Sequence, residues 1–293
     1  MKITEAFERG EFVVTAEVGP PKGCHIENML EEAKTYLSDI TAVNVTDNQS
    51  SVMRLGSLAV CKALKDEGLT PIFQMTCRDR NRIALESDLL SAAMFGIENL
   101  LLLTGDHTKL GDHPQAKPVF DLDSVSLIHT VKQLESGVDL GGNELVGEPP
   151  KFAKGAVVSP CSDSVDVQLA KMERKVAAGA EYFQTQAVYE PEKFIQFMEK
   201  AKQFGKPVQL GIVIPKSVGM CRYMNANVAG IHIPEEMIDE LKADKEKTKA
   251  GITGVEIAAR IIRECKPYCQ GVHIMAMGWE SKVPSLLEQA GLR

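Results

Sequence analysis

The chain has 293 residues, of which 44% are hydrophobic and 25% charged, with a formal net charge of −7. This acidic balance, with only 5% aromatic residues, argues against nucleic acid as a partner, because phosphate binding requires a basic surface. No apolar run reaches the about eighteen residues of a membrane helix, and Met1–Glu5 lacks the pattern of a signal peptide, so we expect a cytoplasmic protein without membrane contact.

The first half of the chain alternates short apolar runs with longer amphipathic segments. Strands are predicted at residues 12–18, 42–46, 72–76 and 100–103. The helices between and after them are predicted at residues 26–37, at 55–66, through Ile83, Leu89, Leu90 and Ala93, and from Asp123 onward. Four consecutive leucines, Leu100–Leu103, are typical of a strand that is buried on both faces of a parallel sheet.

The second half repeats this alternation. Strands are predicted at residues 155–158, 182–186, 208–214 and 272–277, with one helix through Leu169, Met172 and Val176 and others at 192–204, 218–229 and 234–265. Eight strands that alternate with helices predict an α/β fold, a single (βα)8 TIM barrel over residues 1–293. The alternative is a doubly wound open sheet, but the G-x-G-x-x-G turn that usually accompanies it is absent.

The seven cysteines are an odd and scattered set, unlike the even, dense set of a secreted disulfide framework. Cys265 and Cys269 form a C-x3-C pair, which is not a usual zinc spacing, and no second pair is near. We interpret the cysteines as structural thiols and predict no metal site.

Polar residues occur where the predicted strands end. In a (βα)8 barrel these carboxyl ends form one mouth, where active residues lie. The polar or unusual residues at these ends are Glu17, Thr46, Asp47, Gln74, Thr76, Thr104, Gly105, Asp106, Ser159, Gln186 and Trp279.

Glu17 is the most informative of these residues, because it interrupts the apolar run between Ala16 and Val18. Burial of an unpaired carboxylate is costly. One interpretation is a structural acid that pairs with a basic core partner or leans outward. The functional one is a general acid, because burial disfavours the ionised form and lets the carboxyl carry a proton near neutral pH.

Two other strand-end residues have a functional and a structural interpretation. Asp106 is either a ligand contact or a turn residue, and Gly105 before it would let a ligand approach the backbone closely. Trp279, the single tryptophan, either contacts substrate or packs at the rim of the barrel.

Several of these segments resemble the methylenetetrahydrofolate reductase family. Thr15–Pro21 (TAEVGPP) is similar to that family's first strand, Thr104–Asp106 (TGD) to the end of its fourth, and Pro118–Leu122 (PVFDL) to the segment beyond. Arg174–Val176 (RKV), Ala178–Ala180 (AGA) and Thr185–Gln186 (TQ) resemble its fifth helix and sixth strand. The likeness covers nearly the whole chain in order.

The resemblance implies a reductase in which a flavin at the barrel mouth helps to convert 5,10-methylenetetrahydrofolate to 5-methyltetrahydrofolate. Glu17 matches the family's general acid, which protonates the bridging amine of the folate. Asp106 and Gln186 match its pterin contacts, and Met224 falls near its ligand-covering aromatic residue. The flavin contacts carry over to Thr46, Asp47, Gln74, Thr104, Gly105, Asp106, Phe120, Asp121, Ser159, Gln168, Arg174 and Lys175.

The resemblance implies FAD as the cofactor, with FMN as the alternative, since some family members carry His, Arg and Tyr where this chain has Gln74, Thr104 and Ser159. Many relatives take hydride from NADH, whereas anaerobic relatives often pair with an iron–sulfur subunit. Met220–Asn225 (MCRYMN) resembles that second branch, so we expect NADH or a partner subunit as donor, and an oligomer or hetero-complex.

Two other kinds of protein remain open on these residues. One is a flavin-free methyltransferase barrel that binds methyltetrahydrofolate, because it too needs acids and amides at its mouth to hold a pterin. The other is a barrel subunit that has no catalysis of its own.

Overall fold

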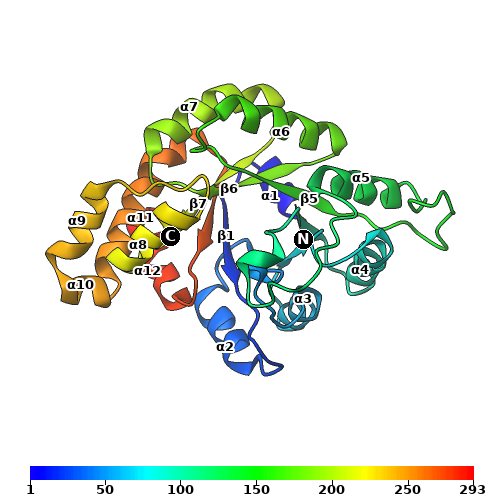
Figure 1. Cartoon of the computed structure of the whole chain (residues 1–293), viewed down its shortest axis with the longest axis horizontal. Coiled ribbons are helices and arrows are strands. Elements are labelled where there is room, and N and C mark those ends of the chain that lie inside the picture. Colours follow the sequence, from blue (N-terminus) through cyan, green and yellow to red (C-terminus); the bar gives the residue numbers. More distant parts are fainter.

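The computed structural model describes residues 1–293 and contains eight parallel strands closed into a barrel in the order β1 to β8 (Figure 1). The strands are β1 Val13–Val18, β2 Ala42–Val45, β3 Pro71–Thr76, β4 Asn99–Leu103, β5 Ala153–Val158, β6 Tyr182–Ala187, β7 Val208–Val213 and β8 Gly271–Met275. β8 pairs with β1 and closes the barrel. The predicted (βα)8 fold is confirmed, and the assignment of residues 1–293 to one catalytic domain stays a prediction.

Helices surround the strands in Figure 1, with α9 and α10 projecting at one edge. They are α1 Ile3–Glu8, α2 Glu27–Tyr36, α3 Ser57–Asp66, α4 Arg82–Met94, α5 Ser124–Glu135, α6 Val165–Ala178, α7 Pro191–Ala201, α8 Val218–Asn227, α9 Glu235–Ala243, α10 Lys245–Lys249, α11 Ile252–Cys265 and α12 Val283–Gln289. Short 3-10 turns include η1 Gln49–Ser51, η2 Thr108–Leu110, η3 Lys202–Phe204, η4 Lys266–Tyr268 and η5 Glu280–Lys282. None of the helices combines the length and the apolar character that crossing a membrane requires.

The helical stretch predicted at residues 234–265 is wrong as one unit, because it forms three helices. Asp244 ends α9, and its side chain accepts a hydrogen bond from the Lys247 N–H, so it caps α10. Gly251 has a φ of 80° and separates α10 from α11. The sequence pattern also missed α1 and α12. In α4, Ile83 is 73% exposed, so the helix buries a different stripe from the one expected.

The barrel interior is apolar near the amino ends of the strands. Alternate strand residues point inward, and Val13, Ile72, Leu101 and Tyr182 belong to a small buried cluster. Ile3 of α1 is fully buried in the same cluster, so this helix packs against the barrel at the amino ends of the strands. The barrel is therefore closed at this end, and its open mouth lies at the carboxyl ends of the strands.

Candidate active site

A cavity of about 370 Å³ lies at the carboxyl ends of the strands. Its volume is within the range of small-molecule sites. Ten residues that the sequence predicts for the barrel mouth line it: Glu17, Asp47, Gln74, Thr76, Thr104, Gly105, Asp106, Ser159, Lys175 and Gln186. The fold thus brings together residues from β1 through β6 that the sequence separates widely.

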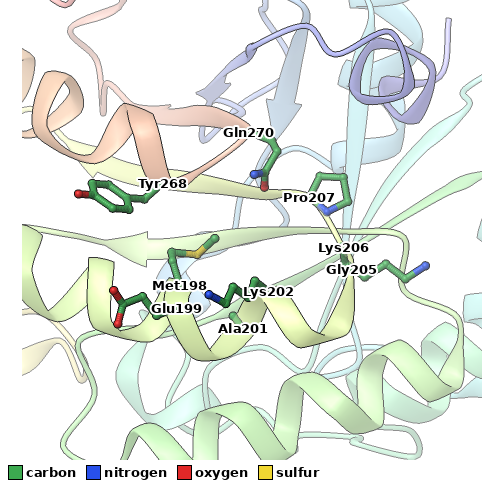
Figure 2. Close-up of a pocket in the computed structure, with 9 residues that line it drawn as sticks. All are labelled: Met198, Glu199, Ala201, Lys202, Gly205, Lys206, Pro207, Tyr268 and Gln270. Carbon is green, nitrogen blue, oxygen red and sulfur yellow. The ribbon is translucent and has the colours of Figure 1, made fainter.

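A larger hollow of about 560 Å³ lies near the amino ends of β7 and β8 (Figure 2). Met198, Lys202 and Tyr268 are among the residues that line it. It is away from every predicted site residue, and active sites of (βα)8 barrels lie at the opposite, carboxyl end. We therefore place the candidate site in the smaller cavity.

Glu17 lies in β1 and is only 6% exposed. Its two carboxyl oxygens have different neighbours. The Gln49 Nε2 donates a hydrogen bond to Oε1 over 3.1 Å, and the His273 Nε2 lies 3.6 Å from Oε2. A titratable partner for Glu17 therefore exists in the core, as the structural interpretation of this acid expected, but the carboxyl also lines the cavity. Sequence reasoning singled out neither Gln49 nor His273.

A buried polar network lies beneath Glu17 and holds the His273 ring. The His273 Nδ1 is 3.0 Å from the Thr15 hydroxyl, which also accepts a hydrogen bond from the Gln209 amide at 3.1 Å. The Gln184 and Asn44 side chains exchange hydrogen bonds of 2.9 and 3.2 Å. Buried polar groups need such partners. The signal for this network was available in the sequence, since each member is a polar residue inside a strand.

Asp47 lines the cavity, but its carboxylate is committed to the protein. Its Oδ2 accepts hydrogen bonds of 2.8 Å from both the N–H and the hydroxyl of Thr76, and it pairs with Arg80. Its neighbour Thr46 is buried, and the Thr46 hydroxyl has no hydrogen-bond partner. An unpartnered buried hydroxyl is costly, so Thr46 has a free polar atom that Asp47 lacks, although Thr46 is not among the residues that line the cavity.

The end of β4 brings backbone close to the cavity. Gly105 has a φ of 91°, and a Cβ there would lie 3.0 Å from the Thr76 Cβ and 3.2 Å from the Arg78 Cβ. Only glycine meets both demands without strain. Arg78, which the sequence analysis did not single out, is 2% exposed and donates to the Asp106 carbonyl over 3.4 Å. The Asp106 side chain lines the cavity and is exposed.

Lys175 reaches the cavity from α6 and is only 8% exposed. Its Nζ donates a hydrogen bond of 2.7 Å to the Val157 carbonyl and forms no ion pair. Burial, followed by the nearby charge of Lys171, lowers the pKa of Lys175 to about 8. Gln168 does not line the cavity, but its side chain accepts a hydrogen bond of 3.3 Å from the Ser159 N–H. A buried cation without an ion-pair partner therefore lines the same cavity as Ser159.

Phe120 and Asp121, both predicted flavin contacts, lie outside the cavity lining. Phe120 has a φ of 41°, and its N–H donates to the Cys77 carbonyl over 3.2 Å. The two Asp121 oxygens accept 2.8 and 2.9 Å hydrogen bonds from the Arg82 guanidinium, which lowers the pKa of Asp121 to about 2. The charge of the Asp121 carboxylate is therefore already balanced by Arg82 within the protein.

Three further predicted residues are not brought into the cavity. Arg174 is exposed, because its position on α6 differs from that of the buried Met172 and Lys175. Met224 is 5% exposed and packs in the hydrophobic core, so the covering role expected at this position has no support from its placement. Trp279 lies at the rim, where the Lys216 Nζ is 4.9 Å from its ring centroid.

The protein is thus a closed (βα)8 barrel whose mouth carries a buried carboxyl, an amide and a cation without an ion pair. Residues 2–291 match the family described as methylenetetrahydrofolate reductase, and the chain belongs to this family.

Relatives with assigned names include the 5,10-methylenetetrahydrofolate reductase of Escherichia coli (strain K12). It is 24% identical over 265 residues, which cover 87% of this chain and 82% of that protein. Methylenetetrahydrofolate reductase 2 of Schizosaccharomyces pombe is 24% identical over 248 residues, or 80% of this chain. The chain spans only 38% of the length of this yeast relative.

Among solved structures, an uncharacterized protein from Clostridium thermocellum that binds two copies of 5-methyl-5,6,7,8-tetrahydrofolic acid is similar with a TM-score of 0.67. The alignment covers 99% of this chain and 98% of that one, at 15% sequence identity. At this identity the likeness supports the fold alone.

Proposed function

We propose that this protein reduces 5,10-methylenetetrahydrofolate to 5-methyltetrahydrofolate with a bound flavin, as an oxidoreductase that acts on a CH–NH group. The observation that carries the proposal is Glu17, a buried carboxyl at the mouth of a barrel that belongs to the methylenetetrahydrofolate reductase family. A carboxyl in this position has the burial that a general acid needs and access to a ligand in the cavity.

Glu17 acts in this proposal as the acid that opens the five-membered ring of the substrate. Its carboxyl gives a proton to the bridging amine nitrogen, which then leaves the methylene carbon as an iminium. The flavin, when bound in reduced form, supplies the hydride that this carbon accepts. Glu17 ends this step as a carboxylate, which the Gln49 amide stabilises through its hydrogen bond to Oε1.

Asp106 and Gln186 are the proposed pterin contacts. The Asp106 carboxylate can accept hydrogen bonds from ring N–H groups, which carboxylates do strongly. The Gln186 Oε1 already accepts a 3.0 Å hydrogen bond from the Ala187 N–H, while its amide nitrogen has no partner in the chain. Gln186 can therefore donate to the pterin while its orientation is fixed by the backbone.

Three further residues have features that fit a flavin. Lys175 supplies a buried positive charge without an ion-pair partner and Gly105 a backbone that a flat ring can approach, and both line the cavity. Thr46 has a buried hydroxyl without a partner, but it is not among the residues that line the cavity. A phosphate would neutralise Lys175 and remove the cost of its isolation. These features favour the flavin enzyme over the flavin-free methyltransferase barrel. FAD is the proposed cofactor and FMN the alternative.

NADH or an iron–sulfur partner subunit is the proposed electron donor, and an oligomer or hetero-complex the proposed assembly. Trp279 and Met224 remain proposed substrate contacts, although Met224 would have to leave the core to reach the cavity.

The visible spectrum of the purified protein tests this proposal. We expect an oxidised-flavin band, in the protein as isolated or after flavin is added, that methyltetrahydrofolate bleaches under anaerobic conditions. A protein that binds methyltetrahydrofolate but never flavin would be a methyltransferase-type barrel. A protein that binds neither ligand would be a structural subunit, and either result would refute the proposal.

A further inference from the structure

The hydrogen bond from Gln49 to Glu17 is made by a loop and not by the barrel. Gln49 lies in η1, between β2 and α3, whereas Glu17 and its other neighbour His273 lie in strands. The Gln49 amide reaches Glu17 Oε1 at 3.1 Å, and both residues line the cavity. The loop therefore contributes a polar group directly to the carboxyl that the proposed reaction uses.

The loop reaches this position only in an unfavourable backbone conformation. Asn48, Ser50 and Ser51, which flank Gln49, have φ values of 44°, 55° and 60°. Residues other than glycine rarely occupy this left-handed region. Such strain persists only when the surrounding structure holds it in place, and it concentrates at functional sites. The backbone strain therefore indicates a functional role for this loop independently of the contact that Gln49 makes.

Two neighbouring segments, one after β3 and one between β4 and α5, hold the loop in place. The buried Arg78 donates to the Asn48 carbonyl over 3.2 Å. The carboxylate of Asp112, in the β4–α5 connection, accepts a 3.0 Å hydrogen bond from the Met53 N–H. Gly111 allows the closest approach, because a Cβ at this position would lie 1.7 Å from the Ser51 carbonyl oxygen. The loop is therefore braced from the ends of β3 and β4.

We propose that Gln49 is a positioning residue that fixes the orientation of the Glu17 carboxyl. An oxygen that accepts an amide N–H is more suitable as the carbonyl oxygen of a protonated carboxyl than as its hydroxyl. The Gln49 hydrogen bond therefore confines the transferable proton to Oε2, the oxygen that lies 3.6 Å from the His273 Nε2. This inference rests on the proposed function, since it assigns a role within that reaction.

The substitution Gln49→Met tests this role, because methionine keeps the length of the side chain but has no donor. The rate of hydride transfer from reduced flavin to methylenetetrahydrofolate should fall by about 10-fold, the loss that one such hydrogen bond represents. Reduction of the flavin by its donor and the calorimetric affinity for 5-methyltetrahydrofolate should both stay within about twofold. Gln203→Met, at an exposed glutamine in η3, is the matched control and should behave as the wild type.

A double-mutant cycle with Glu17→Gln separates positioning from a general effect of the loop. If Gln49 acts through Glu17, then Gln49→Met should cause no further loss of transfer when Glu17 is already glutamine. A further loss of the same size would show that Gln49 acts independently, and the positioning role would be wrong. Should the methionine variant fail to fold, Gln49→Ala serves in the same cycle.

Other outcomes also overturn the inference. Unchanged transfer in Gln49→Met would remove its role, and weaker folate affinity with unchanged transfer would make Gln49 a substrate contact instead. A wild-type protein that transfers no hydride to methylenetetrahydrofolate would refute the proposed function itself, and the positioning role with it. A wild type that does transfer hydride, but no faster than Gln49→Met, would refute the positioning role and leave the proposed function intact.

Discussion

Replacement of Lys175 by methionine should stabilise the flavin-free protein and weaken its affinity for flavin. The ammonium group is buried, forms one hydrogen bond to a backbone carbonyl and has no ion pair. Methionine fills nearly the same space without a charge, so the cost of burying the ammonium disappears.

The magnitude follows from the pKa of Lys175, which burial lowers from the ordinary value of 10.5 to about 8. This change corresponds to roughly 3 kcal/mol of destabilisation at neutral pH. Because the pKa is lower in the folded state, the cost is fully present below pH 8, where both states hold the proton. It fades as the pH rises toward 10.5. Lys175→Met should therefore be more stable than the wild type at pH 7 and should lose this advantage in alkaline solution.

Lys175→Met should weaken the binding of flavin, although it stabilises the flavin-free protein. A charge-assisted hydrogen bond to a phosphate is worth about 1.5–3 kcal/mol, so the dissociation constant of the flavin should rise about 10- to 150-fold. In the wild type the affinity should also fall as the pH rises through about 8, because the ammonium of Lys175 loses its proton. Lys175→Arg should keep its affinity over this pH range.

Urea unfolding of the flavin-free proteins and fluorescence titration with flavin measure the two effects. Lys200→Met, which removes an exposed lysine of α7, is the control for a general loss of positive charge. If Lys175→Met retains flavin as well as the wild type does, Lys175 has no part in the site. If it also gains no stability, the reasoning from its burial is refuted.

Two further predictions concern the folate side of the cavity. Glu17→Gln should fold, bind flavin and be reduced by its donor at a near-normal rate, but its transfer to folate should fall about 10²–10⁴-fold, as expected for loss of a general acid. Stopped-flow measurement of both half-reactions checks this, and an equal slowing of the two would make Glu17 a residue that positions the flavin. Gln186→Glu should weaken the binding of methyltetrahydrofolate and leave flavin content unchanged, because a carboxylate cannot donate to the pterin. Unchanged folate affinity, titrated against the bound flavin, would remove Gln186 from the substrate site.

The placement of Lys175 and Arg174 shows how far the sequence pattern reaches. Successive residues of a helix point in directions about 100° apart, so these neighbours cannot share one face. Leu169, Met172 and Val176 mark the apolar stripe of this helix, and Lys175 follows Met172 by three residues. The pattern could have distinguished the inward lysine from the outward arginine, although the resemblance named both.

The closure of the barrel could be predicted, but the partners of Glu17 could not. A single acid inside an apolar strand can be recognised in the sequence, because the strands of a parallel sheet are buried on both faces and normally consist of apolar residues. His273 becomes its neighbour only because β8 pairs with β1, which joins the two ends of the chain. Gln49 becomes its neighbour only because a strained loop is braced by Arg78 and Gly111.

Local periodicity and the cost of buried charge are therefore sufficient to predict the order of strands and helices, the (βα)8 class and the acid at the mouth. Only the folded chain decides which groups contact that acid. It also decides that Asp47 is committed to Thr76 and Arg80, and that Met224 lies in the core. These are contacts between segments far apart in the chain, and local patterns carry no information about the angle and depth at which such segments meet.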